Sequence, residues 1–266
     1  MKKLIVISDW VNDSLTVQEF RTVVNGFLKN DDSNISFISS SSSTVHTGFL
    51  LNQVVETEEK YGKSLETVIF QNTDPRLDEN SNKGAQFLIL RLKSGLYVCG
   101  PNAGYDFSFI VKKIEESFIY KGIEQPSQFR SRDVFSRICA HLMDEMEDEL
   151  DLDEISTNNI LPLEKYYIGH IDNFGNIKTT IPLDTLKGKF ELNDLVKVKI
   201  NEVERNVKFV TNLFGGKPEE LVIYPGSSGP KNNPYLEITK WSHFEEKSST
   251  GAQAFNNPKP GIIIYF

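Results

Sequence analysis

The chain has 266 residues, of which 39% are hydrophobic and 11% aromatic, enough for one large or two modest domains with a real core. Its 29 basic and 37 acidic residues give a formal net charge of −8, which disfavours nucleic acid as a general partner because phosphate binding needs a basic field. The amino-terminal apolar run is too short for a signal peptide, and no segment approaches the roughly 18 apolar residues that span a bilayer. We expect a soluble, cytoplasmic protein with no membrane association.

The first part of the chain alternates between strands and helices. LIVI (4–7), ISFI (35–38) and TVIF (67–70) are short apolar runs typical of strands buried on both faces of a sheet. Between the first two, Thr16 and Glu19 predict a capping box ahead of an amphipathic helix.

A second helix is expected around GFLLNQVV (48–55), after a run of five serines. Residues 86–100 hold two apolar runs around Lys93-Ser94-Gly95, which is typical of a hairpin. We therefore predict an α/β domain over residues 1–160 with a mixed or parallel central sheet and ligands bound beyond its strand carboxyl ends.

The stretch FRSRDVFSRICAHL (129–142) carries two signals. Its second half predicts a helix with one buried face, since its apolar residues fall at helical spacing: Val134, Phe135, Ile138, Cys139 and Leu142. Its first half places Arg130 and Arg132 beside the positive end of the helix dipole, where cations are unfavourable. The turn therefore either holds a ligand or stabilises itself.

MDEMEDELDLDEI (143–155) carries eight acids and no base. We interpret it as a solvated helix end running into a linker, with metal or partner binding as the alternative. Together with Pro162 it marks the boundary to a second, all-β domain over residues 161–266, a barrel or a sandwich. Its expected strands are YYIGHID, NIKTTI, LVKVKI, VKFV, LVIYP, YLEITKW and GIIIYF, with no strong helix pattern between them.

Polar residues follow three strands of the first domain. Asp9, Asp74 and Asn102 come after LIVI, TVIF and LYVC, and together they predict one polar crevice for a small molecule, although each is also typical of a turn or cap. In the second domain, the segments 171–181 and 224–229 present an aromatic ring with an amide and a PGSSG turn, or else are ordinary hairpin loops.

Several common sites are not expected. There is no GxGxxG, Walker loop, HExxH or GxSxG motif, and the histidines lack ligand spacing, so we expect no metal and no cofactor. The histidines are His46, His141, His170 and His243. Cys99 and Cys139 lie in apolar surroundings without CxxC spacing, which predicts buried free thiols in a reducing compartment.

Taken in order, these segments resemble the S-adenosylmethionine hydroxide adenosyltransferases, relatives of the fluorinase and chlorinase enzymes. FRSRDVFSRICAHL is similar to that family's FHGRDVFAPAAAHL, IDNFGNIKTT to IDRFGNLVTN, GLYVCGPNAG to FVGPDNG, and YPGSSGPKNNPYLEI to VGSSGYLEI. LIVISDW and TVIFQNTDP are similar to its opening strand and to its strand ending in Asp-Pro. The resemblance implies an α/β domain, a β-barrel and a homotrimer whose S-adenosylmethionine lies between subunits.

The resemblance also implies roles for individual residues. Asp9 would hold the ribose hydroxyls, and Asn176, with Phe174 nearby, would serve the adenine. Asp172 would meet the methionine ammonium, and the turn of Ser227 and Ser228 its carboxylate. Asn102 completes the expected binding set.

The catalytic positions depart from the family pattern. Asp74 matches the family's nucleophile-orienting acid and Ser131 the residue lining the nucleophile pocket, but Ser81 stands where an Arg is expected, with Lys83 the nearest cation. Arg130 stands where the family has a His, and an arginine stays protonated and cannot act as a general base. We expect the Arg130 guanidinium to attract a small anion or Asp74 itself.

Three functions are compatible with these residues. The first is cleavage of S-adenosylmethionine at its 5′ carbon by water, giving adenosine and methionine, or by a halide or another anion. The second is a binding protein that kept the adenosyl site and lost turnover. The third is an unrelated small-molecule activity on an α/β domain, with the collinear segments accidental.

Overall fold

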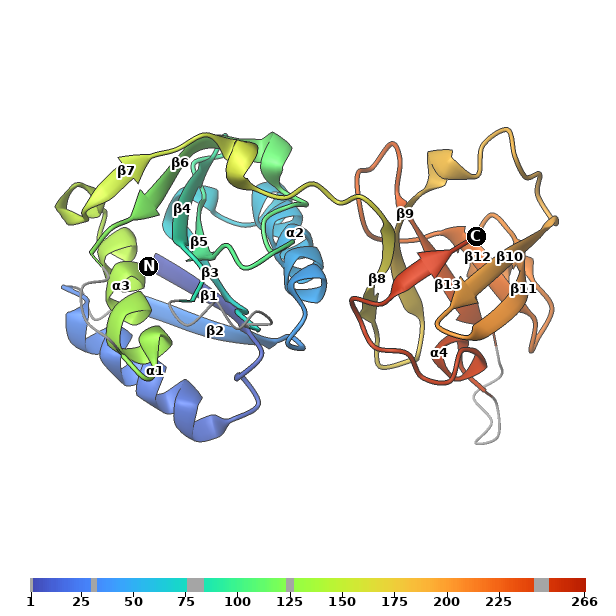
Figure 1. The fold of residues 1–266 in the computed structure, drawn as a ribbon, viewed down its shortest axis with the longest axis horizontal. Helices are drawn as coiled ribbons and strands as arrows, with labels where there is room; N and C mark the ends of the chain where they lie inside the picture. Colours follow the sequence, from blue (N-terminus) through green and yellow to red (C-terminus); the bar gives the residue numbers. More distant parts are fainter. Residues whose placement is uncertain (1, 30–32, 76–83, 123–126, 242–248) are drawn as a thin grey trace. The chain divides into compact units, whose positions relative to one another are not determined.

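The computed structural model describes residues 2–29, 33–75, 84–122, 127–241 and 249–266. They divide into two compact units, Met1–Pro162 and Leu163–Phe266, which differ in secondary structure and are described separately (Figure 1).

The first unit is a seven-stranded mixed sheet with helices on both faces, as predicted, in the order β2-β1-β3-β5-β4-β6-β7. Its strands are β1 (Lys2–Ser8), β2 (Ser33–Ser39), β3 (Thr67–Asn72), β4 (Phe87–Leu92), β5 (Tyr97–Pro101), β6 (Ile114–Tyr120) and β7 (Leu152–Glu154). Its α-helices are α1 (Ser14–Phe27), α2 (Thr44–Tyr61) and α3 (Ser136–Met143). Strands β2, β1, β3 and β5 are parallel, so their carboxyl ends meet at one edge of the sheet.

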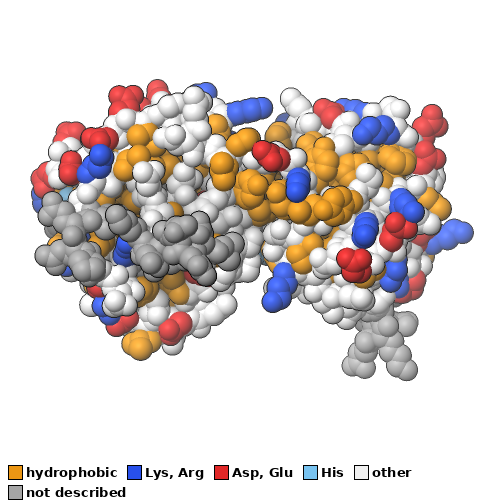
Figure 2. Space-filling view, in the orientation of Figure 1, with side chains coloured by type: hydrophobic (Ala, Val, Ile, Leu, Met, Phe, Trp, Pro, Cys, Tyr) orange, Lys and Arg blue, Asp and Glu red, His pale blue; other side chains and the backbone are white. Residues whose placement is uncertain are grey.

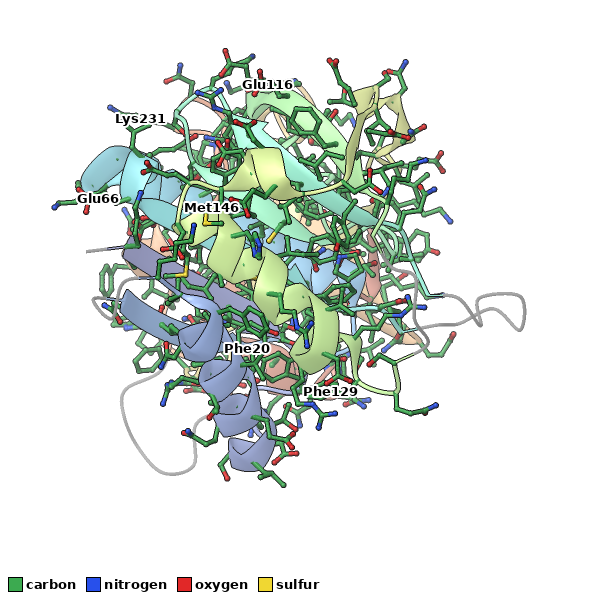
Figure 3. All side chains as sticks on the ribbon, turned by 90° about the vertical axis from the view of Figure 1, so that its left-hand side faces the viewer. Phe20, Glu66, Glu116, Phe129, Met146 and Lys231 are labelled. Atoms are coloured by element: carbon green, nitrogen blue, oxygen red, sulfur yellow. The ribbon has the colours of Figure 1, made fainter. Side chains whose placement is uncertain are left out.

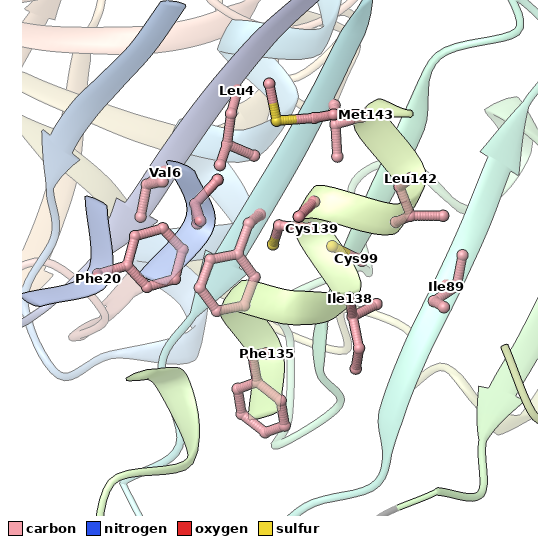
Figure 4. Close-up of a cluster of buried hydrophobic side chains, with 14 of the residues drawn as sticks. Leu4, Val6, Phe20, Ile89, Cys99, Phe135, Ile138, Cys139, Leu142 and Met143 are labelled. Atoms are coloured by element: carbon pink, nitrogen blue, oxygen red, sulfur yellow. The ribbon is translucent and has the colours of Figure 1, made fainter. Parts of the chain in front are cut away.

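Strand β1 is apolar throughout because both faces of the sheet are covered. Leu4 and Val6 pack with α1 and α3, whereas Ile5 and Ile7 face the opposite cluster, which includes residues of α2. The first cluster also contains the two cysteines, both buried and unpaired by disulfide (Figure 4). Burial raises the pKa of the Cys139 thiol, and its neighbour Cys99 raises it further, so this thiol is unsuited to act as a nucleophile.

The predicted capping box at the start of α1 is wrong. The N-cap is Asp13, whose carboxylate accepts hydrogen bonds from the Leu15 amide at 3.0 Å and the Thr16 hydroxyl at 2.9 Å. Thr16 therefore lies inside the first turn and donates to the cap. An Asp in the cap position satisfies the same free backbone donors as a Ser or Thr would, and its short side chain reaches them from two residues earlier.

The acidic stretch after α3 is not a linker. Residues Leu152–Glu154 form β7, which pairs with β6 at the edge of the sheet, and Ile155 donates its backbone N–H to the carbonyl of Ser117. Charged side chains on an edge strand face solvent and oppose edge-to-edge association. Because charged residues are so dense here, the sequence does not show the alternation of polar and apolar residues that predicts a strand.

The second unit is a closed barrel in the order β10-β11-β12-β13-β9-β8-β14, which settles the choice between barrel and sandwich. Its strands are β8 (Tyr166–Ile171), β9 (Ile177–Pro182), β10 (Leu195–Ile200), β11 (Val203–Phe209), β12 (Leu221–Pro225), β13 (Tyr235–Lys240) and β14 (Ile263–Tyr265). A short helix that the sequence pattern did not predict, α4 (Gly251–Ala254), begins with a capping box formed by Thr250 and Gln253.

Alternation along the barrel strands separates core from surface. In β10, Val196, Val198 and Ile200 are fully buried while Leu195 and Lys197 are exposed. On the face of this unit seen in Figure 2, acidic and basic side chains are interspersed. Among the helices of the described residues, none combines the length and apolar character that a bilayer crossing requires.

Candidate active site

A cleft of about 330 Å³ lies at the carboxyl edge of the first unit's sheet. Asp9 and Trp10 follow directly on β1, Asn72 ends β3, and Asp74 lies two residues further on. Residues 128–131 and Phe135 line it from the start of the α3 segment. The structure thus brings together two of the three predicted strand-end residues, together with Arg130 and Ser131.

The turn that begins α3 stabilises itself through its second arginine. Asp133 accepts from the Nε of Arg132 at 2.7 Å and from the Ser127 hydroxyl at 2.6 Å, and these bonds lower the pKa of its carboxyl. The Arg132 guanidinium also lies over the Phe129 ring, 5.6 Å from its centre. Residues Ser131–Phe135 form a π-helical turn, a distortion common at functional sites.

Phe129 fixes the position of this turn against β1. Its ring meets that of Trp10 edge to face with centroids 6.3 Å apart, and Trp10 also packs against Phe20 of α1. Figure 3 shows Phe20 and Phe129 on one side of the unit, where α1 and α3 pack together. The indole Nε1 of Trp10 is buried without a hydrogen-bond partner among the described residues, so this residue of the cleft has a donor to offer.

Ser131 is tied to the end of β3. Its Oγ accepts from the Nδ2 of Asn72 at 2.8 Å, while the Ser8 hydroxyl donates to the Asn72 carbonyl at 2.7 Å. Because Ser131 accepts in this bond, its own O–H remains able to donate. A buried hydroxyl with an unused proton in a cleft suits an electron-rich atom such as a water oxygen or an anion.

Arg130 and Asp74 approach each other beside Gly84. Arg130 Nη1 lies 2.5 Å, and Asp74 Oδ2 3.0 Å, from the point where a Cβ on Gly84 would lie. Asp74 Oδ2 accepts from the Ala85 amide at 3.0 Å. Within the described part of the chain no ion pair joins Arg130 to Asp74, and no hydrogen bond engages the Arg130 guanidinium. The cleft therefore carries a cation that the described residues leave available.

Asn102 is not part of this cleft. Its Nδ2 donates to the carbonyl of Asn159 at 3.0 Å, and its Oδ1 is buried without a partner among the described residues. The amide therefore holds the chain after β5 to the segment before Pro162. The predicted departure Ser81 and its neighbour Lys83 lie outside the described residues.

In the second unit, Asp172 and Asn176 stabilise one turn together. Asp172 Oδ1 accepts from the Phe174 and Asn176 amides at 2.9 and 3.0 Å, and its Oδ2 accepts from the Asn176 side chain at 3.0 Å. Asn176 Oδ1 in turn accepts from the Thr239 hydroxyl. These bonds point the Phe174 ring outward, 72% exposed. Large exposed rings of this kind can stack on a flat ligand.

The second predicted turn of this unit holds Ser227 and Ser228 between two glycines. Ser227 is exposed and its Oγ accepts from Lys178 Nζ at 3.1 Å, whereas Ser228 is buried. Gly229 has a φ of +82°, which favours glycine. Lys178 was not predicted. An isolated lysine in a strand alternating between core and surface is an ordinary surface residue by pattern, and only the structure shows it beside Ser227.

The predicted absence of metal ligands stays a prediction. Of the histidines that the structure describes, His170 lies on β8, and the other two form hydrogen bonds through Nδ1. His46 Nδ1 bonds with Ser41, and His141 Nδ1 with the carbonyl of Arg137. His243 lies outside the described residues. Among the residues that are described, no group of three or more His, Cys, Asp or Glu is placed to hold a metal ion.

Comparison with known proteins first identifies relatives in sequence. Residues 166–238 match the family model described as the SAM hydroxide adenosyltransferase C-terminal domain. The chain is 27% identical over 172 residues to the (R)-S-adenosyl-L-methionine hydrolase of Methanocaldococcus jannaschii, a match that covers 62% of each chain and so less than two thirds of that relative.

Two solved structures share the fold over nearly their whole length. A conserved uncharacterized protein from Thermotoga maritima superposes with a TM-score of 0.69 at 20% identity, covering 98% of both chains. A conserved hypothetical protein from Thermus thermophilus gives 0.65 at 16% identity, covering 99% of both. At these identities the likeness concerns the fold alone.

Proposed function

We propose that this chain is a member of the SAM hydroxide adenosyltransferase family and that it cleaves S-adenosyl-L-methionine at the 5′ carbon, giving adenosine and L-methionine. The observation that carries the proposal is the first unit's cleft, where Asp9, Asp74, Arg130 and Ser131 lie together. The named activity of the curated relative supports the same reaction.

The proposed reaction is an in-line displacement. A water oxygen forms a bond to C5′ while the C5′–S bond breaks, its electron pair returns to sulfur to give methionine, and the water releases one proton to solvent. Because the sulfonium is already a good leaving group, the protein's task is to position and desolvate the nucleophile. S-adenosylmethionine is the substrate, and the proposal invokes no cofactor.

The cleft residues divide this task. Asp9 accepts hydrogen bonds from the ribose hydroxyls, as an acid directly after the first strand can. Asp74 orients the water, and the Ser131 O–H donates to it or to an anion in its place. Arg130 remains protonated and lowers the cost of bringing hydroxide or another anion close to the carbon.

The second unit supplies groups for the rest of the substrate. Phe174 and Asn176 take the adenine, Asp172 the ammonium, and the turn of Ser227 and Ser228 the carboxylate. We propose that these residues come from a neighbouring subunit of a homotrimer in the cytoplasm, where the two buried thiols stay reduced. Light scattering at micromolar concentration tests the assembly, since a monomer would contradict a site shared between subunits.

The test of the reaction is product analysis. Purified protein is incubated with S-adenosylmethionine, with and without chloride, and the nucleosides are separated by chromatography. Adenosine in both samples supports hydrolysis. A 5′-chloro nucleoside that requires chloride supports a halide nucleophile instead, the alternative favoured by the guanidinium beside the Ser131 hydroxyl.

A second candidate function is binding without turnover. It is favoured by Arg130, which stands where the resemblance predicts a histidine and cannot accept a proton. Under this alternative the ligand co-purifies or binds unchanged. Arg130→His separates the two functions: adenosine formed only by this variant supports a binding protein, whereas adenosine formed by the wild type supports an enzyme.

A further inference from the structure

A row of polar side chains crosses four adjacent strands of the barrel. Tyr224 of β12 is the cross-strand partner of Glu237 of β13, Glu237 pairs with Lys178 of β9, and Lys178 pairs with His170 of β8. Their sequence neighbours Ile177, Leu236 and Ile238 are fully buried in the barrel core, so the row lies on the outer face. Cross-strand partners on one face are in contact range of one another.

The members of this row are largely shielded from solvent. Glu237 is 6% exposed and Tyr224 9%, and the Lys178 side chain is 19% exposed. The turn of Ser227 covers the carboxylate, since a Cβ on Gly226 would lie 2.7 Å from Glu237 Oε2. A shielded Lys–Glu pair is weak evidence for stability, because desolvation offsets its attraction.

Lys178 carries the positive charge of this row, because His170 is neutral at neutral pH. Burial lowers the pKa of His170, and the nearby charge of Lys178 lowers it further against the opposing effect of Asp172. His170 is therefore neutral at neutral pH. Burial and Glu237 together raise the pKa of Tyr224, which stays a phenol.

Unused hydrogen-bond donors lie on this lysine and on the turn that it contacts. Lys178 Nζ donates to Ser227 Oγ at 3.1 Å and to Glu237 Oε2 at 3.3 Å, which leaves one of its three N–H groups. In the described part of the chain, the backbone N–H groups of Ser227, Ser228 and Gly229 have no acceptor. An ammonium beside several free amides is the donor set that a carboxylate accepts from.

A counter-charge lies on the neighbouring turn. Three hydrogen bonds from its own turn fix the position of the Asp172 carboxylate, and both Asp172 and Lys178 act electrostatically on His170. An acid and a base held near each other match the ammonium and carboxylate of an α-amino acid. Of these two residues, only the base can distinguish an amino acid from an amine, because both ligands carry the ammonium and only the amino acid carries the carboxylate.

We propose, building on the function proposed above, that Lys178 is the residue that makes the site specific for a sulfonium carrying an α-carboxylate. Its free N–H, with the amides of the Ser227 turn, binds the substrate carboxylate, while Asp172 binds the ammonium. The same position is a valine in the family segment that IDNFGNIKTT resembles. The lysine is therefore a feature of β9 in this chain and not of that family segment.

The test compares two ligands and two proteins. S-adenosylmethionine and its decarboxylated form, which has the amine but no carboxylate, are titrated by calorimetry into wild type and Lys178→Met, and adenosine release is measured for both. Wild type is expected to prefer the carboxylated ligand by roughly ten- to a hundredfold, the range of one charge-assisted hydrogen bond. Lys178→Met is expected to lose that preference by weakening only the carboxylated ligand, which raises the KM for S-adenosylmethionine.

Two further variants guard against misfolding. Lys178→Met leaves Glu237 buried without its partner, so the pair Lys178→Met with Glu237→Gln removes both charges, and Lys178→Arg keeps the cation. Equal weakening of both ligands in the double variant, or an intact preference in Lys178→Met, overturns the specificity role and leaves the proposed function standing. Wild type that binds neither ligand overturns both.

Discussion

Several polar side chains around the first unit's cleft have hydrogen-bond donors that no described residue uses. The polar side chains in the second unit's turns instead form hydrogen bonds with one another. Arg130 and the indole of Trp10 have no partner within the described residues, and the Ser131 proton is unused. Asp172 and Asn176 instead fix each other's positions.

The difference fits the roles that we propose for the two regions. Groups that bind a ligand by shape and charge gain from being held in place before it arrives, because less conformational freedom is lost on binding. Groups that meet a reacting atom must still have a bond to offer when it arrives. Variants in the cleft should therefore change binding or chemistry with little effect on stability, whereas variants in the turns should change both.

The largest expected effect comes from Asp9→Ala. Loss of a charge-assisted hydrogen bond, typically worth about 1.5–3 kcal/mol, should weaken adenosyl ligands by roughly ten- to a few hundredfold. Calorimetry with adenosine and S-adenosylmethionine measures this change.

Asp13→Ala is the matched control for this variant. It removes the N-cap of α1 and should lower the unfolding free energy by about 1 kcal/mol while leaving affinity unchanged. Unchanged affinity in a folded Asp9→Ala protein would mean that Asp9 only ends its strand.

A second pair of variants tests the contrast in stability. Asn176→Ala removes partners of Asp172 and Thr239 in the turn and should lower the unfolding free energy of the barrel by about 1–3 kcal/mol. Arg130→Met removes a side chain that no described group engages, and should stay within about 0.5 kcal/mol of wild type. Denaturant titration of both proteins would break the comparison if Arg130→Met proved the more destabilising.

Glycine substitutions sharpen the description of the cleft. Gly84 has a φ of +69°, and an alanine there would also meet Arg130 Nη1, so Gly84→Ala should cost about 1–2 kcal/mol. Gly26 lies in α1 with open space around its Cα, so Gly26→Ala should stabilise by about 0.5–1 kcal/mol. A melting temperature of Gly84→Ala that equals or exceeds that of wild type would contradict the strained backbone inferred at Gly84.

The smallest expected effect is a pH dependence in the second unit. The pKa of His170 is lowered from 6.5, first by burial and then by Lys178, so below pH 6.5 the unfolded chain takes up a proton that the folded chain resists. The unfolding free energy should therefore fall as the pH drops below 6.5, until the pH passes the lowered value. His170→Gln should remove this share of the slope, and identical slopes in both proteins would show that His170 is not responsible.

The fold was largely predictable because apolar runs and alternation report burial directly. LIVI and TVIF are continuous because helices cover both sheet faces, and the hairpin turns at Gly95, whose φ is +80°. Two local features were predicted wrongly, the cap of α1 and the acidic stretch after α3. Asp13, not Thr16, is the residue that caps the helix amides. The edge strand Leu152–Glu154 was missed because its charged residues do not show the alternation typical of a strand.

The site was predictable only where chain order sets position. Parallel strands bring Asp9 and Asp74 to one edge, so their convergence follows from topology. Asn102 also follows a strand, but its side-chain amide donates a hydrogen bond to the carbonyl of Asn159. Residue spacing in the sequence does not predict this contact. Trp10 and Lys178 were not predicted as site residues. In the sequence Trp10 resembles a core residue and Lys178 a surface residue, and only the structure shows where their polar atoms lie.

Adenosine release by wild type, Asp74→Asn and Glu116→Gln under identical conditions tests most directly whether the cleft is where the chemistry takes place. Glu116→Gln is a control on β6, where the carboxylate pairs with Arg91 away from the cleft. We expect release by wild type and Glu116→Gln alike, and a decrease of at least about tenfold in Asp74→Asn, because the neutral amide cannot orient the water as the carboxylate does. Brisk wild-type release that survives Asp74→Asn would contradict this expectation.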